Sequence, residues 1–299
     1  MVKIEQISKS FANIEAVKSC NFEVKEGEMF GIIGPDGAGK TTLLRMITSL
    51  IVPDSGKISL WGLDPVADYK QVRHMIGYMP GKFSLYMDLT IEENLEFFAT
   101  VFDTTIQENY HLIKDIYQQI EPFKKRPAGK LSGGMKQKLA LSCALIHKPK
   151  LLILDEPTTG VDAVSRKEFW AMLQKLKAAN ITIIVSTPYM DEASLCDRIA
   201  LMQNGEILTI ETPEVIRNNF KKQLLGIKSS SFYKLINDLK LYPMMNSVYP
   251  FGEFLHYTDK ADEVDLQALR GYLQENGHTD VVIEVIKPDI EDCFMRLMK

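Results

Sequence analysis

One octapeptide constrains the fold of this 299-residue chain more than any other segment. Residues 34–41 read GPDGAGKT, follow the apolar run MFGII and lead into the helix-like segment TTLLRMITSLI. Glycines let consecutive backbone N–H groups converge on one anion at a helix N-terminus, whose partial positive charge adds to the attraction. We therefore predict a phosphate-binding loop between a buried strand and a helix. A Gly-rich turn with an exposed lysine is the alternative, and the flanking strand and helix argue against it.

Four residues would carry the chemistry of such a site. In the loop, Lys40 would bridge the β- and γ-phosphates of a nucleotide, and the Thr41 hydroxyl would bind Mg²⁺. Asp155 ends a second apolar run, LLILD, where its carboxylate would hold Mg²⁺ through water. Glu156 follows and is placed to polarise an attacking water, which makes it the candidate catalytic residue. The expected cofactors are therefore ATP and Mg²⁺. In the alternative interpretation, Asp155 and Glu156 only make the end of the strand soluble.

The order of apolar runs indicates the fold class. Short apolar strands alternate with amphipathic helices as far as about residue 220, which favours an α/β domain. MFGIIG, KLLILDEP and ITIIVST are continuous runs, as expected for strands buried on both faces. From residue 89 to residue 147 the strand signal fades, and we expect a helical insert. Its first helix has Thr90 as N-cap, with Glu93 completing a capping box.

Near Phe220 the chain changes character. The segments that follow alternate as β-α-β-β-α-β and end in a helix, which is the ferredoxin-like pattern. We therefore divide the chain into residues 1–221 and residues 222–299, the second part being a small α+β accessory or regulatory domain. Ser229, Ser230 and Ser231 indicate a strand-to-helix turn with a capping serine. An extension of the first sheet is the alternative.

Charge and cysteine usage exclude several classes of protein. The formal net charge of −4 argues against a nucleic-acid partner, because such proteins normally carry a basic excess. The four cysteines are scattered without a CxxC pair, so we expect reduced core thiols in a cytosolic protein. The start, MVKIEQISKSF, alternates like a strand and predicts no signal peptide. No apolar run approaches the ~18 residues of a membrane span, so any role at a membrane must depend on a partner.

A second glycine-rich helix start lies at residues 131–138, which read LSGGMKQK. Ser132, Gly133 and Gly134 repeat the pattern of small residues at a helix N-terminus that binds phosphate. One nucleotide does not need two such cradles in one chain. The second cradle is needed where two molecules dock face to face and each completes the other's site.

With these motifs in this order, residues 2–216 resemble the ABC-type ATPases, the nucleotide-binding subunits of ABC transporters. The resemblance identifies residues 34–42 as Walker A, residues 151–156 as Walker B and residues 131–134 as the signature that acts in trans. It implies that Phe11 stacks on adenine with Val17 beneath it, and that Asp162 lies in the D-loop, which touches the opposite subunit. The implied nucleotide-binding residues of Walker A are Gly34, Pro35, Asp36, Gly37, Ala38, Gly39, Lys40, Thr41 and Thr42, and those of the signature are Leu131, Ser132, Gly133 and Gly134.

The chain departs from the family pattern at two sensor positions. After the strand ending in VST the family has a histidine that contacts the γ-phosphate, and this chain has Pro188. After Met79 and Pro80 the family has a glutamine that reaches Mg²⁺ and water, and this chain has Gly81. Asp36, where the family usually has asparagine, is a milder difference that we interpret as neutral. Two losses beside intact binding elements predict a site that holds ATP and turns it over slowly; tolerated variation in an ordinary ATPase is the alternative.

The resemblance implies the ATP-binding subunit of a transporter, most similar to multidrug and ABC-2 exporters. Its implied partners are integral membrane permease subunits and a second ATPase subunit, with a heterodimer favoured, and its implied place is the inner face of the cell membrane, reached through the permease. A soluble nucleotide-binding regulatory protein without a transport role is the alternative. ABC proteins of translation or DNA repair would carry two ATPase halves or a long coiled-coil insert, neither of which this sequence has.

Overall fold

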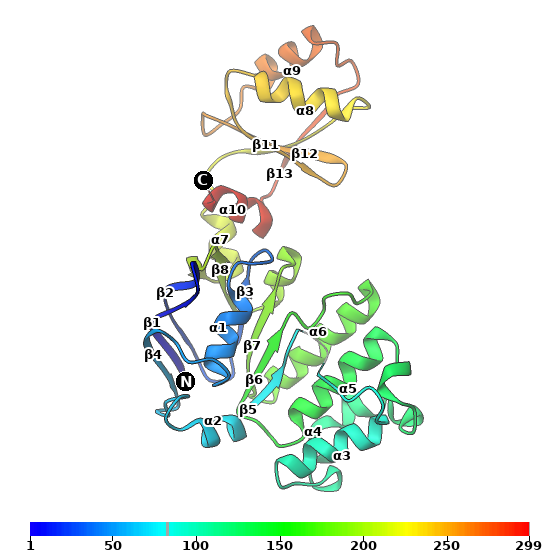
Figure 1. Ribbon diagram of the computed structural model, residues 1–299. Coiled ribbons are helices and arrows are strands. Elements are labelled where there is room, and N and C mark those ends of the chain that lie inside the picture. The colour runs from blue at the N-terminus through cyan, green and yellow to red at the C-terminus, as the bar shows by residue number, and fades with distance from the viewer. Residues whose placement is uncertain (82–83, 299) are drawn as a thin grey trace. The chain divides into compact units, whose positions relative to one another are not determined.

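The computed structural model describes residues 1–81 and 84–298, which form two compact units. The first unit comprises Met1–Pro213 and the second Glu214–Lys299 (Figure 1). Within the described residues, no helix is both long enough and apolar enough to cross a bilayer. All four cysteines are buried.

A mixed six-stranded sheet forms the centre of the first unit, in the order β5-β6-β7-β3-β8-β9. Neighbouring strands are parallel except for β8 and β9. Every residue of β3, β6 and β7 is buried, as the continuous apolar runs predict. The strands are β3 (Met29–Ile33), β5 (Ile76–Met79), β6 (Leu151–Asp155), β7 (Thr182–Thr187), β8 (Arg198–Gln203) and β9 (Glu206–Glu211).

An antiparallel sheet, β2-β1-β4, packs on the same core through helix α1 (Lys40–Ile47). Leu43 and Leu44 of α1 belong to one hydrophobic cluster with Ile4 of β1 and Ile153 of β6. The helix that follows the glycine-rich loop is thereby enclosed between two sheets, which fixes the direction of its N-terminus. The remaining elements here are β1 (Val2–Phe11), β2 (Ile14–Val24), β4 (Ser55–Leu60) and α2 (Tyr69–Met75).

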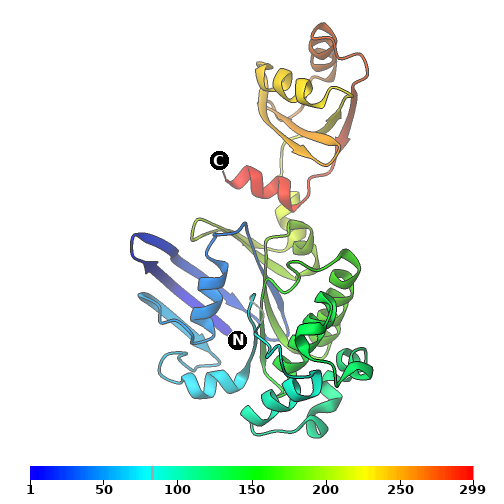
Figure 2. The same ribbon diagram turned by 45° about the vertical axis from the view of Figure 1, so that its right-hand side comes forward.

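The helical insert lies on the side of the unit away from β1, β2 and β4 (Figures 1 and 2). It contains α3 (Ile91–Val101), α4 (Ile106–Tyr117), two short 3₁₀ helices, η1 (Glu121–Phe123) and η2 (Ala128–Lys130), and α5 (Gly133–Leu145). The predicted capping box is confirmed, since the Thr90 hydroxyl accepts from Glu93 N and the Glu93 carboxylate accepts from Thr90 N. Helix α6 (Ala163–Ala178) follows Walker B.

Strand β7 does not lead directly into a helix. Residues Met190–Leu195 form a 3₁₀ helix, η3, with Tyr189 at its N-cap position. Pro188 therefore lies between strand and helix, in neither element. The side chain of Glu192 in this 3₁₀ helix is buried, and its carboxylate accepts hydrogen bonds from the Thr158 and Thr187 hydroxyls.

The second unit has the order β10-α8-β11-β12-α9-β13-α10, preceded by α7 (Pro213–Asn218). Its antiparallel sheet, β11-β12-β10-β13, together with two crossover helices is a split β-α-β arrangement. Helices α8 and α9 share one hydrophobic cluster with the sheet. The elements are β10 (Leu224–Lys228), α8 (Phe232–Leu241), β11 (Met245–Phe251), β12 (Phe254–Asp259), α9 (Leu266–Glu275), β13 (Val282–Ile286) and α10 (Ile290–Leu297).

The predicted capping serine of this unit is wrong in its chemistry. Ser231 occupies the N-cap position of α8, but its side chain makes no capping hydrogen bond. Asp280 organises the turn instead, because its carboxylate accepts from the Ser229 hydroxyl at 2.8 Å and from Ser230 N at 2.7 Å.

Candidate functional site

The glycine-rich loop connects β3 to α1, and two of its glycines are required by their surroundings. A Cβ at Gly34 would lie 2.0 Å from the carbonyl oxygen of Met202, and one at Gly39 would lie 2.2 Å from that of Ala16. Gly39 also has φ of 104°, a conformation that side chains disfavour. The backbone can therefore turn tightly into the N-terminus of α1 only with glycine at these positions.

Lys40 lies beneath this loop with its side chain almost fully buried. Its ammonium group donates to the carbonyl oxygens of Gly34 and Pro35 at 2.8 and 2.9 Å. It also lies 3.1 Å from Oε1 of Glu156. The one buried cation of the loop is thereby held between the backbone of the loop and the Glu156 carboxylate.

A second set of polar contacts surrounds Asp155, which is 2% exposed. Its Oδ1 accepts from the Thr41 hydroxyl at 3.0 Å and from the Ser186 hydroxyl at 2.7 Å. Ser186 also fixes the next residue, since Glu156 N donates to both its carbonyl and its hydroxyl oxygen. Ser186 was not predicted as a site residue. The sequence feature that could have indicated it is a hydroxyl side chain within the otherwise apolar run ITIIVST.

Lys40, Thr41 and Glu156 line a cleft of about 590 Å³, whereas Asp155 does not line it and is joined to it through the Thr41 hydroxyl. Phe11 and Val17 do not line it: Phe11 is exposed on β1 with the Lys9 ammonium 5.6 Å from its ring centre, and Val17 is fully buried. Stacking of adenine on Phe11 therefore stays a prediction. Pro35 and Asp36 lie exposed at the tip of the loop. The residues lining the cleft are Asn13, Ile14, Glu15, Ala16, Lys18, Gly37, Ala38, Gly39, Lys40, Thr41, Thr42, Glu156 and Asn204.

The signature residues lie elsewhere and do not line this cleft. Ser132 caps α5, its hydroxyl accepting from Met135 N at 3.3 Å, and Leu131 before it is buried. The two glycines that follow face the start of α6: a Cβ at Gly134 would lie 2.7 Å from the Ser165 hydroxyl, and one at Gly133 would lie 3.9 Å from the carbonyl oxygen of Gly160. One chain thus keeps its two glycine-rich helix starts in separate places.

Asp162 caps α6, the helix against which the signature packs. Its Oδ1 accepts from Val164 N at 3.1 Å and from Ser165 N at 3.0 Å. The bond from Ser165 N is the main cause that lowers the pKa of Asp162, because it stabilises the ionised carboxylate. Asp162, the predicted D-loop acid, is therefore held in its ionised form and fixed in place by the helix it begins.

The two sensor positions lie on opposite sides of the Walker B acids. A Cβ at Gly81 would lie 3.1 Å from the carbonyl oxygen of Asp155 and 3.7 Å from its Oδ2. Pro188 directly follows Thr187, the last residue of β7, one position beyond Ser186. A polar side chain at position 81 would therefore reach Asp155, which is expected to hold the metal. Gly81 has no side chain that could do so.

The donor set matches the expected ligands chemically. The Thr41 hydroxyl and the Asp155 carboxylate present oxygen atoms, which Mg²⁺ prefers, and Mg²⁺ typically takes one or two carboxylates and completes its shell with water and substrate phosphate. Backbone N–H groups at the start of α1 and the Lys40 ammonium suit phosphate oxygens.

Comparison with known proteins agrees with this geometry. A model of the ABC transporter family matches residues 17–159. The Nod factor export ATP-binding protein I of Rhizobium sp. (strain N33) is 34% identical over 301 residues, covering 99% of this chain and 96% of that protein. The chain belongs to the ABC transporter family of ATP-binding proteins. The expected fold class and the recognised family are therefore confirmed.

Other known proteins and solved structures also resemble this chain. The probable multidrug ABC transporter ATP-binding protein YbhF of Escherichia coli (strain K12) is 41% identical over 304 residues, but this chain spans only 52% of its length. Among solved structures, an ATP-binding subunit of an ABC transporter is 28% identical with a TM-score of 0.67, covering 74% of this chain and 93% of that one. An ATP-binding cassette solved as a dimer after hydrolysis, with ADP and Pi, is 27% identical with a TM-score of 0.64, covering 71% and 98%.

Proposed function

We propose that this chain is the ATP-binding and ATP-hydrolysing part of an ABC exporter, and that it works with a separate membrane permease. The observation that carries the proposal is that Lys40, Thr41 and Glu156 line one cleft and that Asp155 is bonded to Thr41 at its edge. The relatives named for multidrug transport and Nod factor export support an exporter. A place at the inner face of the membrane follows from the permease.

Within this proposal each residue of the cleft has one role. The loop N–H groups and Lys40 bind the β- and γ-phosphates, while Thr41 and Asp155 hold Mg²⁺, which when bound would neutralise charge on the phosphates. Glu156 accepts a proton from the attacking water. Ser186 orients the two acids, since it donates to Asp155 and accepts from Glu156 N.

We further propose that this site hydrolyses ATP slowly. Gly81 and Pro188 offer no side-chain donor or acceptor to the water or the γ-phosphate. Loss of a group that positions or accepts a proton typically costs ~10²–10⁴-fold in rate. Lys40 and Thr41 are present, so ATP binding is retained. Bound ATP would therefore stay unhydrolysed for longer than in a site that has both sensor side chains.

The partner that would complete the arrangement is a second ATPase subunit. The signature Ser132 and Gly134 lie apart from the chain's own cleft, which supports their use on a nucleotide held by another subunit. A heterodimer is favoured because a partner with both sensors would turn over the ATP that this signature contacts. A relative solved as a dimer supports a paired arrangement.

The test measures ATP binding by calorimetry and phosphate release by the full chain, with and without Mg²⁺. We expect Mg²⁺-dependent tight binding and slow release. Asp155→Asn should remove most of the Mg²⁺ dependence, whereas the control Asp54→Asn, an exposed acid paired with Lys9, should not. Absence of ATP binding would overturn the proposal, and binding without any hydrolysis, even with a permease and a second ATPase present, would favour a regulatory protein.

A further inference from the structure

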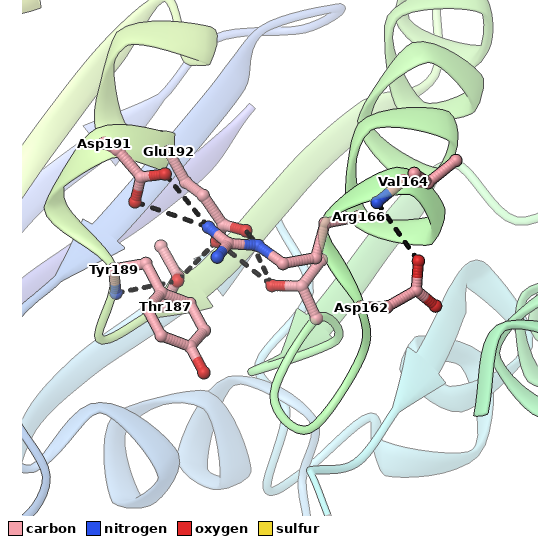
Figure 3. Close-up of polar contacts among 8 residues, drawn as sticks. Asp162, Val164, Arg166, Thr187, Tyr189, Asp191 and Glu192 are labelled. Atoms are coloured by element: carbon pink, nitrogen blue, oxygen red, sulfur yellow. Dashed lines mark hydrogen bonds and ion pairs between the residues drawn. The ribbon is translucent and has the colours of Figure 1, made fainter.

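A buried carboxylate beside the Pro188 position joins three segments of the first unit (Figure 3). Glu192 of η3 is 2% exposed, and its partners are Thr158, Thr187 and Arg166. These four residues are called the Glu192 clamp below. They come from the turn after Walker B, the end of β7, the first turn of α6 and η3.

Both carboxylate oxygens of Glu192 act only as acceptors. Oε1 accepts from the Thr158 hydroxyl at 2.8 Å and from Arg166 Nε at 3.1 Å. Oε2 accepts from the Thr187 hydroxyl at 2.5 Å, with the Thr158 hydroxyl at 3.1 Å. Charge-assisted bonds of this kind are about twice as strong as neutral ones. A carboxylate with so little solvent contact depends on these donors, since an unpaired buried charge is costly.

Two members of the clamp are bonded in turn to the loop at position 188 and to the segment that begins α6. The Thr187 hydroxyl accepts from Tyr189 N at 3.1 Å, which encloses Pro188 between two bonded residues. Arg166 N donates to the carbonyl oxygen of Asp162 at 2.9 Å, and the Arg166 guanidinium lies 4.3 Å from the Tyr189 ring centre. The Glu192 carboxylate thus connects the loop at position 188 with the helix that carries the D-loop acid.

The turn after Walker B completes the connection. Thr158 lies two residues after Glu156, and Thr159 N donates to the Glu156 carbonyl oxygen at 3.2 Å. Glu156 itself has φ of 49°, a conformation that non-glycine residues rarely adopt. The surrounding structure has to hold such a backbone in place. A hydroxyl two residues away, fixed by a buried charge, is well placed to do so.

We propose that Glu192 is a positioning residue for ATP hydrolysis, which holds Glu156, the position-188 loop and the D-loop helix in one fixed arrangement. The inference rests on the proposed function, because it concerns the reaction at that site. No clamp residue lines the nucleotide cleft, so the clamp acts on the rate of the chemical step and not on ATP affinity. A misplacement of about 1 Å caused by a remote change can cost ~10²-fold in rate.

Glu192→Gln is the sharpest probe of this role, because it changes few atoms and breaks the pattern of acceptors. In the wild type, Arg166 Nε and the Thr187 hydroxyl each donate to one carboxylate oxygen of Glu192. A glutamine amide has one oxygen and one N–H₂ group, so its N–H₂ group would face one of these two donors. Asp191→Asn is the matched control: the same kind of change on the next residue, whose carboxylate is 75% exposed and touches only the outer nitrogen of Arg166.

The experiment measures single-turnover ATP hydrolysis by the full chain with enzyme in excess, which resolves slow rates, and ATP affinity by calorimetry. Both are recorded well below the melting temperature of each variant. We expect Glu192→Gln to lower the hydrolysis rate constant about 10- to 100-fold with ATP affinity unchanged within twofold, and Asp191→Asn to change neither by more than twofold. Thr187→Val should behave like Glu192→Gln, and Thr187→Ser, which keeps the hydroxyl, should restore the rate.

A rate constant for Glu192→Gln within twofold of the wild type would overturn the proposal. So would equal losses in Thr187→Val and Thr187→Ser, or a loss of ATP affinity that matches the loss of rate, because either result describes general destabilisation. Failure of the proposed function looks different, since the wild-type chain itself would then not bind ATP in the same calorimeter.

Discussion

The Lys40 ammonium lies 3.1 Å from Oε1 of Glu156, so the lysine of the phosphate loop and the proposed base form an ion pair. A γ-phosphate bound by Lys40 would compete with the Glu156 carboxylate for the same charge. Nucleotide binding would therefore release Glu156 to accept a proton from water. The arrangement links occupation of the loop to availability of the base within one cleft.

Lys40→Ala should weaken ATP binding at least tenfold. The substitution removes the buried cation of the loop and its charge-assisted contact with phosphate. Lys175→Ala is a suitable control, because Lys175 is exposed and pairs with Asp115 outside the cleft. Titration calorimetry with MgATP measures both. Equal affinity in the wild type and Lys40→Ala would remove the nucleotide-binding interpretation of the loop.

Pro188→His combined with Gly81→Gln should raise the hydrolysis rate of the isolated chain. Asp155 and Glu156 are present, so the change restores only the missing sensors. A Cβ at position 81 lies 3.1 Å from the Asp155 carbonyl oxygen, so a local shift of a few tenths of an ångström is expected. Pro188→Ala with Gly81→Ala is the control, which removes the ring and adds the Cβ without sensor groups. A brisk wild-type rate, near the ~10 s⁻¹ median of enzymes, would show that Pro188 is no handicap.

The strands and the phosphate loop could be predicted from the sequence because their signals are local. The three continuous apolar runs correspond to the fully buried strands β3, β6 and β7. The glycine- and lysine-containing segment before a helix corresponds to the loop that lines the cleft. The Thr90 cap depended on residues three positions apart and was also predictable. Local patterns suffice where the partner is within one helical turn.

Contacts between distant residues could not be predicted in this way. The Glu192 clamp joins residues 34 positions apart, and nothing near Glu192 in sequence indicates that its carboxylate is buried. The turn before α8 shows the same limit, since Asp280, about 50 residues away, accepts from the Ser229 hydroxyl and from Ser230 N. Side chains that cross the fold depend on packing, which a local pattern does not record.

Truncation after Phe220 should leave ATP binding unchanged within twofold. Every residue that lines the cleft lies in the first unit, and the second unit has its own sheet and hydrophobic cluster. The proposed division at residues 221 and 222 falls a few residues beyond the boundary of the compact units. Calorimetry measures affinity and circular dichroism measures folding. An unfolded truncated protein would contradict the division into separable domains.

His147 should make the stability of the first unit depend on pH. Burial lowers the pKa of His147 from 6.5 to about 4, because the ring, stacked on Phe102, is largely removed from water; the bond from Nε2 to the Ile76 carbonyl oxygen opposes this shift only in part. The unfolded chain binds this proton more readily than the folded one. The stabilising contribution is therefore complete well above pH 6.5 and is lost as the pH falls toward 4, by about 2 kcal/mol between pH 7 and pH 5.

The measurement compares urea unfolding of the wild type and His147→Phe at pH 7 and pH 5. Tryptophan fluorescence reports the first unit, because Trp61 and Trp170 both lie in it. The variant should lose less stability on acidification than the wild type, whereas His111→Gln, a change on the exposed face of α4, should lose as much as the wild type. Identical losses in all three proteins would contradict a buried neutral imidazole at position 147.

The last prediction concerns which changes stop a heterodimer formed with a second, complete ATPase subunit. In a head-to-tail pair, Ser132 and Gly134 of this chain would contact the ATP of the partner, while its own ATP lies in a cleft without sensor groups at positions 81 and 188. Ser132→Arg would place bulk and charge against the partner's nucleotide, so it should abolish steady-state ATPase activity. Glu156→Gln removes the base of the slower site and should lower the activity only modestly. If Glu156→Gln abolished activity and Ser132→Arg were mild, this chain would be an ordinary hydrolytic subunit and its proline incidental.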